Sequence, residues 1–102
     1  MTGPYGPDAY ISRQNPAWRV LTIVGMGGKG LLAAFGQVVK EARLSANLSQ
    51  EQLGFNAGLN RNYVADIEKG RRKPSLITIF SLAKGLGLSP GVLMTRTESH
   101  LR

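Results

Sequence analysis

A chain of 102 residues has room for one domain with one modest hydrophobic core. Because it contains no cysteine and a single histidine, His100, the composition excludes a disulfide framework, a thiolate zinc site, a cysteine nucleophile and a cage of histidine ligands. Thirteen lysines and arginines against six acidic residues give a formal net charge of +7, and this excess favours a polyanionic partner, nucleic acid before membrane.

Residues 1–30 differ in composition from the rest and are expected to form an irregular N-terminal arm. They hold three of the five prolines and six of the thirteen glycines. The β-prone run 18–24 within them is expected to pair with a second copy, to pack on the helices or to stay unstructured. No apolar stretch approaches the roughly 18–20 residues of a membrane span, and prolines stand where a signal peptide is apolar. Met26 is a candidate start of the natural protein.

From Leu31 onward, apolar residues recur every three or four positions, which predicts an all-α bundle of five helices. The expected ranges, in chain order, are about 31–46, 50–57, 61–69, 76–86 and a short fifth helix that begins at residue 90. The polar stretch 97–102 is expected to be a frayed tail, so that the predicted domain spans 31–96.

Residue types that stabilise helix ends mark the boundaries. A serine or asparagine stands as predicted N-cap before four of the helices, at Ser49, Asn60, Ser75 and Ser89. Gln52 would complete a capping box with Ser49, Gly58 would end the second helix, and Pro90 suits a first helical position. The fourth helix has a predicted inner stripe of Leu76, Ile79, Leu82, Ala83 and Leu86.

The glycine-rich stretch 25–30 matches the letters of a dinucleotide-binding fingerprint. No βαβ unit is predicted after it, and Leu31-Leu32 stand where a phosphate-binding loop needs lysine and a hydroxyl residue. A flexible glycine linker explains the stretch, so nucleotide binding is rejected. Since the chain also offers no nucleophile and base as a pair, we expect no enzymatic activity and no cofactor or metal.

The second and third predicted helices, joined by the tight turn at Gly58, have the lengths of a helix-turn-helix. The third helix would bury Val64 and Ile67 and would turn outward Arg61, Asn62, Ala65, Asp66 and Lys69. Arginine and asparagine suit the edges of bases, and Asn60 and Tyr63 can reach phosphates. Three consecutive cations follow at the same edge, namely Arg71, Arg72 and Lys73. The alternative is a solvated polar face without a ligand.

The segments SQEQL, AGL, RNYVADIEKG and RRKPSL between residues 49 and 76 closely resemble the Xre-type, lambda repressor-like helix-turn-helix family. The resemblance covers about residues 32–95. It implies a five-helix DNA-binding domain that works as a two-fold dimer, as in phage repressors and restriction–modification controllers. It further implies a phosphate contact from Gln50, base-facing positions for Arg61, Asn62 and Asp66, and a structural ion pair between Arg43 and Glu68.

Three residues depart from the family pattern. Gly54 and Gly85 stand where alanine is usual, and each costs up to about 1 kcal/mol of helix propensity. Asn62 replaces a small hydroxyl residue, which predicts an unusual sequence preference.

Together these observations predict a cytoplasmic, sequence-specific transcription regulator that binds palindromic double-stranded DNA as a homodimer, without a membrane or small-molecule partner. The alternative is a protein-interaction module of the same fold, such as an antitoxin or a coactivator-like adaptor. Apolar residues at the start of the fifth helix predict the dimer interface, namely Leu88, Val92 and Leu93 with Met94. The alternatives are that they cover the chain's own core, or that the run 20–24 pairs two chains.

Overall fold

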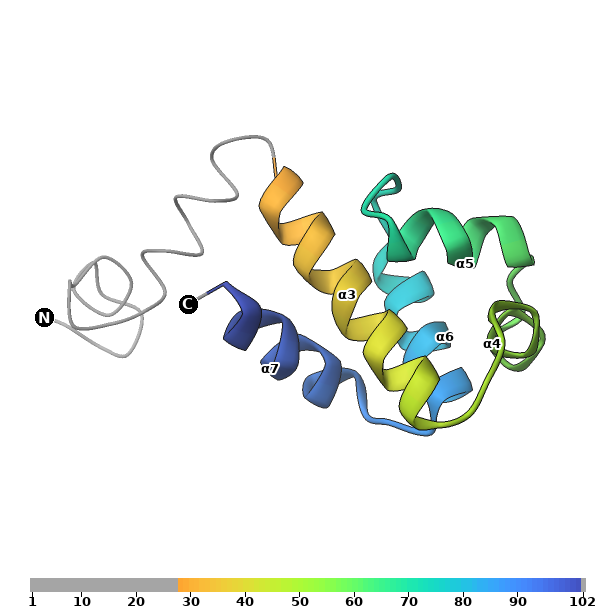
Figure 1. The fold of residues 1–102 in the computed structure, drawn as a ribbon. Helices are drawn as coiled ribbons and strands as arrows, with labels where there is room; N and C mark the ends of the chain where they lie inside the picture. The colour runs from red at the N-terminus through yellow and green to blue at the C-terminus, as the bar shows by residue number, and fades with distance from the viewer. Residues whose placement is uncertain (1–27, 102) are drawn as a thin grey trace, which may run out of the picture.

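In the computed structural model, which describes residues 28–101, five helices pack around one core (Figure 1). They are α3 (Lys29–Ser45), α4 (Gln50–Ala57), α5 (Arg61–Glu68), α6 (Leu76–Leu86) and α7 (Pro90–His100). The described residues contain no strand, so the predicted all-α class with five helices is confirmed. The predictions for the β-prone run and for Met26 lie outside the described residues.

Four of the five described helices begin directly after a residue whose side chain caps the helix. The side chains of Ser49, Asn60, Ser75 and Ser89 each accept a hydrogen bond from the backbone N–H three residues later. The backbone N–H of Ser49 in turn donates to Gln52 Oε1 at 2.8 Å, which completes the capping box. Each cap gives a partner to an N–H that the helix itself leaves unpaired. The four predicted caps are therefore confirmed.

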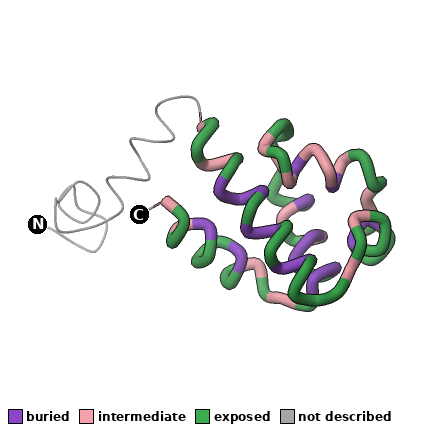
Figure 2. Tube along the Cα trace, in the orientation of Figure 1, coloured by how far each residue is buried: buried purple, intermediate pink, exposed green. Residues whose placement is uncertain are grey.

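The core forms where all five helices meet. Helix α3 runs through the middle, with α7 along one side and α4 and α5 at the other, and it contacts α5, α6 and α7 (Figure 1). The buried positions turn toward the interior of this arrangement (Figure 2). The most deeply buried large side chains are Val38, Val39, Leu53, Val64, Ile67, Leu82 and Leu93. Their burial supplies the main favourable free energy of folding.

Helix α7 is longer than predicted. It continues to His100, whereas a frayed tail was expected from Thr97. The Thr97 hydroxyl is buried and donates to the backbone oxygen of Leu93 at 2.7 Å. At the end of the helix, His100 Nε2 lies 3.2 Å from Glu41 Oε1 of α3. The predicted tail is corrected, because these contacts with its own turn and with α3 hold the last residues in the helix.

Helix α6 differs from the predicted inner stripe at its first turn. Leu82, Ala83 and Leu86 are buried as predicted, but Leu76 is exposed and Thr78 is buried instead. The Thr78 hydroxyl oxygen accepts a hydrogen bond from the Ser75 hydroxyl at 3.1 Å. Because apolar residues stand on both sides of this turn, their spacing alone does not select the buried side.

No single helix within residues 28–101 is both long and apolar enough to cross a membrane. Helices α6 and α7 meet the length and hydropathy criteria only as a pair, and they are bent by 102° at the break between them. Both helices supply buried side chains to the core, including Leu82 and Leu93.

Two glycines allow segments of the backbone to approach one another closely. A Cβ atom on Gly36 of α3 would lie 2.4 Å from the backbone oxygen of Ile67, closer than real Cβ contacts occur. On Gly54 of α4, a Cβ atom would lie 2.6 Å from the backbone oxygen of Leu59. From the sequence alone, the only effect predicted for Gly54 was a loss of helix propensity. In the structure, the lack of a side chain is what lets the chain turn tightly after α4.

We expect Gly36→Ala to lower the free energy of unfolding by about 2–3 kcal/mol, because the added methyl group must force α3 away from α5. Gly91→Ala is the matched control within a helix, since a Cβ atom there would meet only Ser89 Oγ, at 3.9 Å. Alanine at that site should stabilise the protein by up to about 1 kcal/mol. Urea denaturation followed by circular dichroism measures both changes. Similar effects of the two variants would contradict the close approach at Gly36.

Candidate nucleic-acid interface

Helices α4 and α5 form a compact helix-turn-helix. Helix α4 has eight residues and is followed by the C-cap residue Gly58, whose φ of 72° is a left-handed conformation that glycine adopts at little cost. The backbone N–H of Leu59 then donates to the Gly54 oxygen at 2.8 Å, and the Leu59 side chain packs against the core. Asn60 starts α5 immediately afterwards. The short connection is therefore held by its own hydrogen bonds and by the core.

Helix α5 buries one face and presents the opposite face to solvent. Val64 and Ile67 lie in the core, as predicted. The predicted outward positions are either exposed (Arg61, Asn62 and Lys69) or half-buried (Ala65 and Asp66). The helix therefore has the orientation that base recognition would require.

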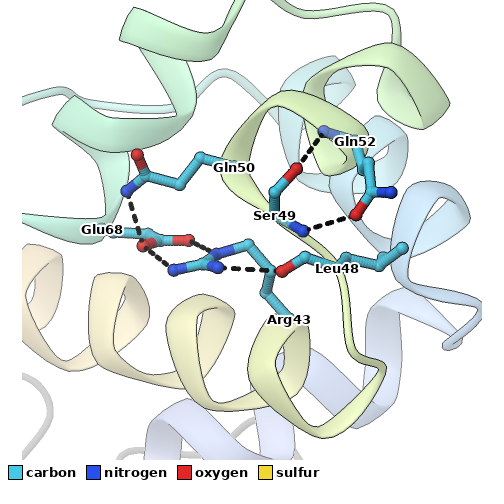
Figure 3. Close-up of polar contacts among 6 residues, drawn as sticks. All are labelled: Arg43, Leu48, Ser49, Gln50, Gln52 and Glu68. Carbon is cyan, nitrogen blue, oxygen red and sulfur yellow. Dashed lines mark hydrogen bonds and ion pairs between the residues drawn. The ribbon is translucent and has the colours of Figure 1, made fainter.

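A buried ion pair holds α5 against α3 (Figure 3). Arg43 Nε donates to Glu68 Oε2 at 2.6 Å, and Arg43 Nη2 donates to Glu68 Oε1 at 3.0 Å. Arg43 Nη1 donates to the backbone oxygen of Leu48 at 2.9 Å. The side chains are only 10% and 3% exposed, respectively. The pair implied by the family resemblance is thus present, in the bidentate geometry that makes such bonds strong.

Gln50 at the start of α4 joins the same cluster. Its Nε2 donates to Glu68 Oε1 at 3.1 Å, so the carboxylate receives donors from both α3 and α4 (Figure 3). The resemblance implied a phosphate contact for Gln50. Since an amide nitrogen carries two hydrogens, one is engaged by Glu68 and the second stays available for that contact.

A polar depression of about 540 Å³ lies beside this cluster at the start of α4. Its lining consists of Arg43, Ser49, Gln50, Glu51 and Arg61. The first N–H groups of a helix and an arginine favour an anion, whereas the carboxylate of Glu51 opposes it. Arg61 of α5 and Gln50 of α4 therefore line the same depression.

Several predicted contact residues have partners within the chain. Arg72 Nε lies 3.6 Å from Asp66 Oδ2, and the Arg72 guanidinium carbon lies 5.1 Å from the centre of the Tyr63 ring. The Tyr63 hydroxyl lies 3.3 Å from Thr78 Oγ1, and Asn60 serves as a helix cap. Within residues 28–101, no hydrogen bond or ion pair engages the side chains of Arg61, Asn62, Lys69, Arg71 and Lys73. These five have their polar groups free for a ligand.

The predicted dimer residues on α7 are only partly accessible. Leu93 is fully buried in the chain's own core, so it is corrected to a core residue and removed from the predicted interface. Leu88 is half-buried against the same core, and Val92 is 37% exposed. Much more apolar surface is open on α6, where three large side chains are exposed by 70%, 78% and 55%, namely Leu76, Ile77 and Phe80. We refer to these three as the α6 face.

Comparisons with known proteins agree with this geometry. A helix-turn-helix family model matches residues 39–93. The control protein C.BamHI of Bacillus amyloliquefaciens is 47% identical over 64 residues, which cover 62% of this chain and 79% of that protein. The restriction-modification controller protein C.AhdI from Aeromonas hydrophila superposes with a TM-score of 0.60 and 45% identity, over 61% of this chain and 94% of that structure. The wild-type controller C.Esp1396I superposes with a TM-score of 0.65 and 28% identity, over 69% and 92%.

Removing either partner of the buried ion pair should strand the other charge. We expect Glu68→Gln and Arg43→Met each to lower the free energy of unfolding by about 3 kcal/mol, and the double variant to lose clearly less than the sum. Glu41→Gln is the matched control, because this carboxylate is exposed and its loss should change stability by less than about 1 kcal/mol. Chemical denaturation measures all four proteins. Strictly additive losses would show that the two residues are not coupled.

Proposed function

Because the chain belongs to the helix-turn-helix family of DNA-binding transcription regulators, we propose that it binds palindromic DNA sequence-specifically as a homodimer. The observation that carries this proposal is the exposed face of α5, where Arg61 and Asn62 have free polar groups on a helix held by Glu68. In a major groove, arginine pairs with guanine and asparagine with adenine. The loop with Arg71 and Lys73 supplies phosphate contacts beside them.

The named relatives support a role in controlling a restriction–modification system. C.BamHI is a control protein, and C.AhdI is a restriction-modification controller protein. The shared region makes up 79% of the first and 94% of the second, so it is most of each of those proteins. The regulator we propose is cytoplasmic and acts by occupying an operator, where it blocks or recruits polymerase, and its family is not one of enzymes.

A single helix-turn-helix reads only a few base pairs, which is too little to select a site in a genome. Two-fold pairing doubles the contacts and requires a palindromic operator. The α6 face offers more exposed apolar surface than Val92 on α7, and such patches are typical of interfaces. Since Leu76 starts α6 three residues after Lys73, pairing there brings the basic loops of the two copies toward the two-fold axis. We therefore propose that the dimer interface lies on the α6 face and not on α7.

Selection from random-sequence duplex DNA, followed by titration at several salt concentrations, tests the DNA-binding role. We expect an inverted repeat to be enriched. With six or more phosphate contacts, affinity should fall by about a thousandfold or more between roughly 50 and 200 mM salt. Failure to enrich any sequence, with negligible affinity even at low salt, would favour the protein-interaction module instead.

Arg61 and Arg71 should affect DNA binding differently. We expect Arg61→Ala to cost about 1–3 kcal/mol on the selected site and to relax the preference at one position of each half-site. Arg71→Ala is the matched control, chosen over Arg72 because Arg72 pairs with Asp66. It should weaken all sequences similarly and reduce the salt slope by about one. Indistinguishable profiles in a titration of site variants would overturn the assignment of Arg61 to base contact.

Two aspartate variants separate the two candidate dimer surfaces. Ile77→Asp should give folded monomers, because a charge in the centre of the α6 face cannot be buried without a partner. Val92→Asp on α7 is the matched control and should leave the dimer intact. Sedimentation at tens of micromolar, with circular dichroism to verify folding, measures both. Monomers from Val92→Asp alone would return the interface to α7.

A further inference from the structure

An apolar groove lies between the first turns of α3 and the C-terminal half of the fold. Its lining includes Leu31, Leu32 and Phe35 of α3, Ile79 of α6 and Met94 of α7. The groove has a volume of about 160 Å³. A cavity of about 150 Å³ with a similar lining is large enough to hold a benzene molecule. The groove therefore has the size and chemistry to accept one large apolar side chain.

Three apolar residues of the lining are partly accessible in the part of the chain that the structure describes. Leu31 and Leu32 are only half-buried, and Met94 is 39% exposed. These residues lie on α3 and α7, at the opposite ends of the described chain, and no residue between 28 and 101 fills the space between them. Apolar surface in a concave site gains free energy when an apolar group covers it.

A covalent connection joins the N-terminal arm to the start of α3, beside the groove. Gly28 precedes α3 and lies within one turn of Leu31, so the chain enters the fold beside the groove. The sequence 18–24 reads WRVLTIV and is the most apolar part of the arm. Only four peptide units separate Val24 from Gly28, which limits the distance between their Cα atoms to at most about 14 Å. Glycines at 25, 27 and 28 permit the chain to reverse its direction there.

We propose that residues 18–24 of the same chain dock in this groove and fill it with an apolar side chain. A short tether gives the segment an effective local concentration in the millimolar range, above that of a second copy at micromolar protein. The tether therefore favours the chain's own arm over another molecule as the occupant. Of the three arrangements expected for the β-prone run 18–24, this one is packing on the helices.

Docking of the arm has a consequence for the DNA-facing loop. Lys73 and Pro74 also line the groove, so a docked segment packs against the loop that carries the proposed phosphate contacts. This consequence rests on the proposed function, whereas the docking itself does not.

Intrinsic fluorescence of the full chain tests the docking, because its single tryptophan, Trp18, lies in the proposed segment. We expect the emission of the parent protein to be shifted to the blue of free tryptophan and protected from acrylamide. Met94→Asp places a charge in the groove and should return both properties toward those of free tryptophan. Val92→Asp is the matched control on the same helix, because Val92 does not line the groove, and it should change neither property.

A pair of substitutions in the arm keeps the test independent of the stability of α7. Leu21→Asp together with Ile23→Asp should have the same effect on Trp18 as Met94→Asp, while circular dichroism shows the helices unchanged. A solvent-like Trp18 in the parent protein, or equal effects of Met94→Asp and Val92→Asp, would overturn the proposal. Trp18 emission that depends on protein concentration would identify a second copy as the occupant and would also overturn it. None of these measurements uses DNA, so the proposed function and the docking can fail separately.

Discussion

The carboxylate of Glu68 joins three helices, and the position of the candidate DNA-reading surface depends on it. It accepts hydrogen bonds from Arg43 of α3 and from Gln50 of α4, while it belongs to the last turn of α5. Arg43 directs its remaining donor to the Leu48 oxygen, so the cluster satisfies its own polar groups. Within the buried side chains of residues 28–101, no nitrogen or oxygen atom lacks a hydrogen-bond partner. Burial makes such a cluster costly to break, and this specifies a single orientation of α5.

Steric contacts as well as electrostatic ones fix this orientation of α5. Gly36 lets the backbone of α3 approach the backbone of Ile67 and Glu68 at the end of α5, and Arg43 binds the side-chain carboxylate of the same Glu68. Helix α5 is thus held along its buried face and at its end, while Arg61 and Asn62 stay free at its start. Side chains presented on a rigid element lose less conformational freedom on binding than side chains on a loop. The same logic applies to Arg72, which is already positioned by Asp66 and Tyr63.

The small size of the domain explains why it leaves apolar surface open. A core built from five short helices cannot cover every large apolar side chain, and the described chain leaves the α6 face and the groove beside α3 accessible. The two surfaces differ in shape. The α6 face is an outward helix surface that suits a symmetric partner, whereas the groove is concave, narrow and next to the entry of the arm. Shape and tether length therefore favour different occupants, a second copy for the α6 face and the arm for the groove, as we propose above.

Local chemistry in the sequence was enough to determine the helix starts and the polar face of α5. The caps at Ser49 and Asn60 use atoms only three residues away, and the burial of Val64 and Ile67 follows from helical periodicity. The family resemblance added the Arg43–Glu68 pair, which spacing alone does not indicate.

Only the tertiary structure decided which residues of an apolar-rich helix lie inside. Leu76 is exposed, Leu93 is buried, and α7 continues to His100, which contacts a residue distant in sequence. Glu41, the partner of His100, lies 59 positions away along the chain. A side chain on a helix with two apolar sides has no local preference between them, so the neighbouring helices select the side that is buried.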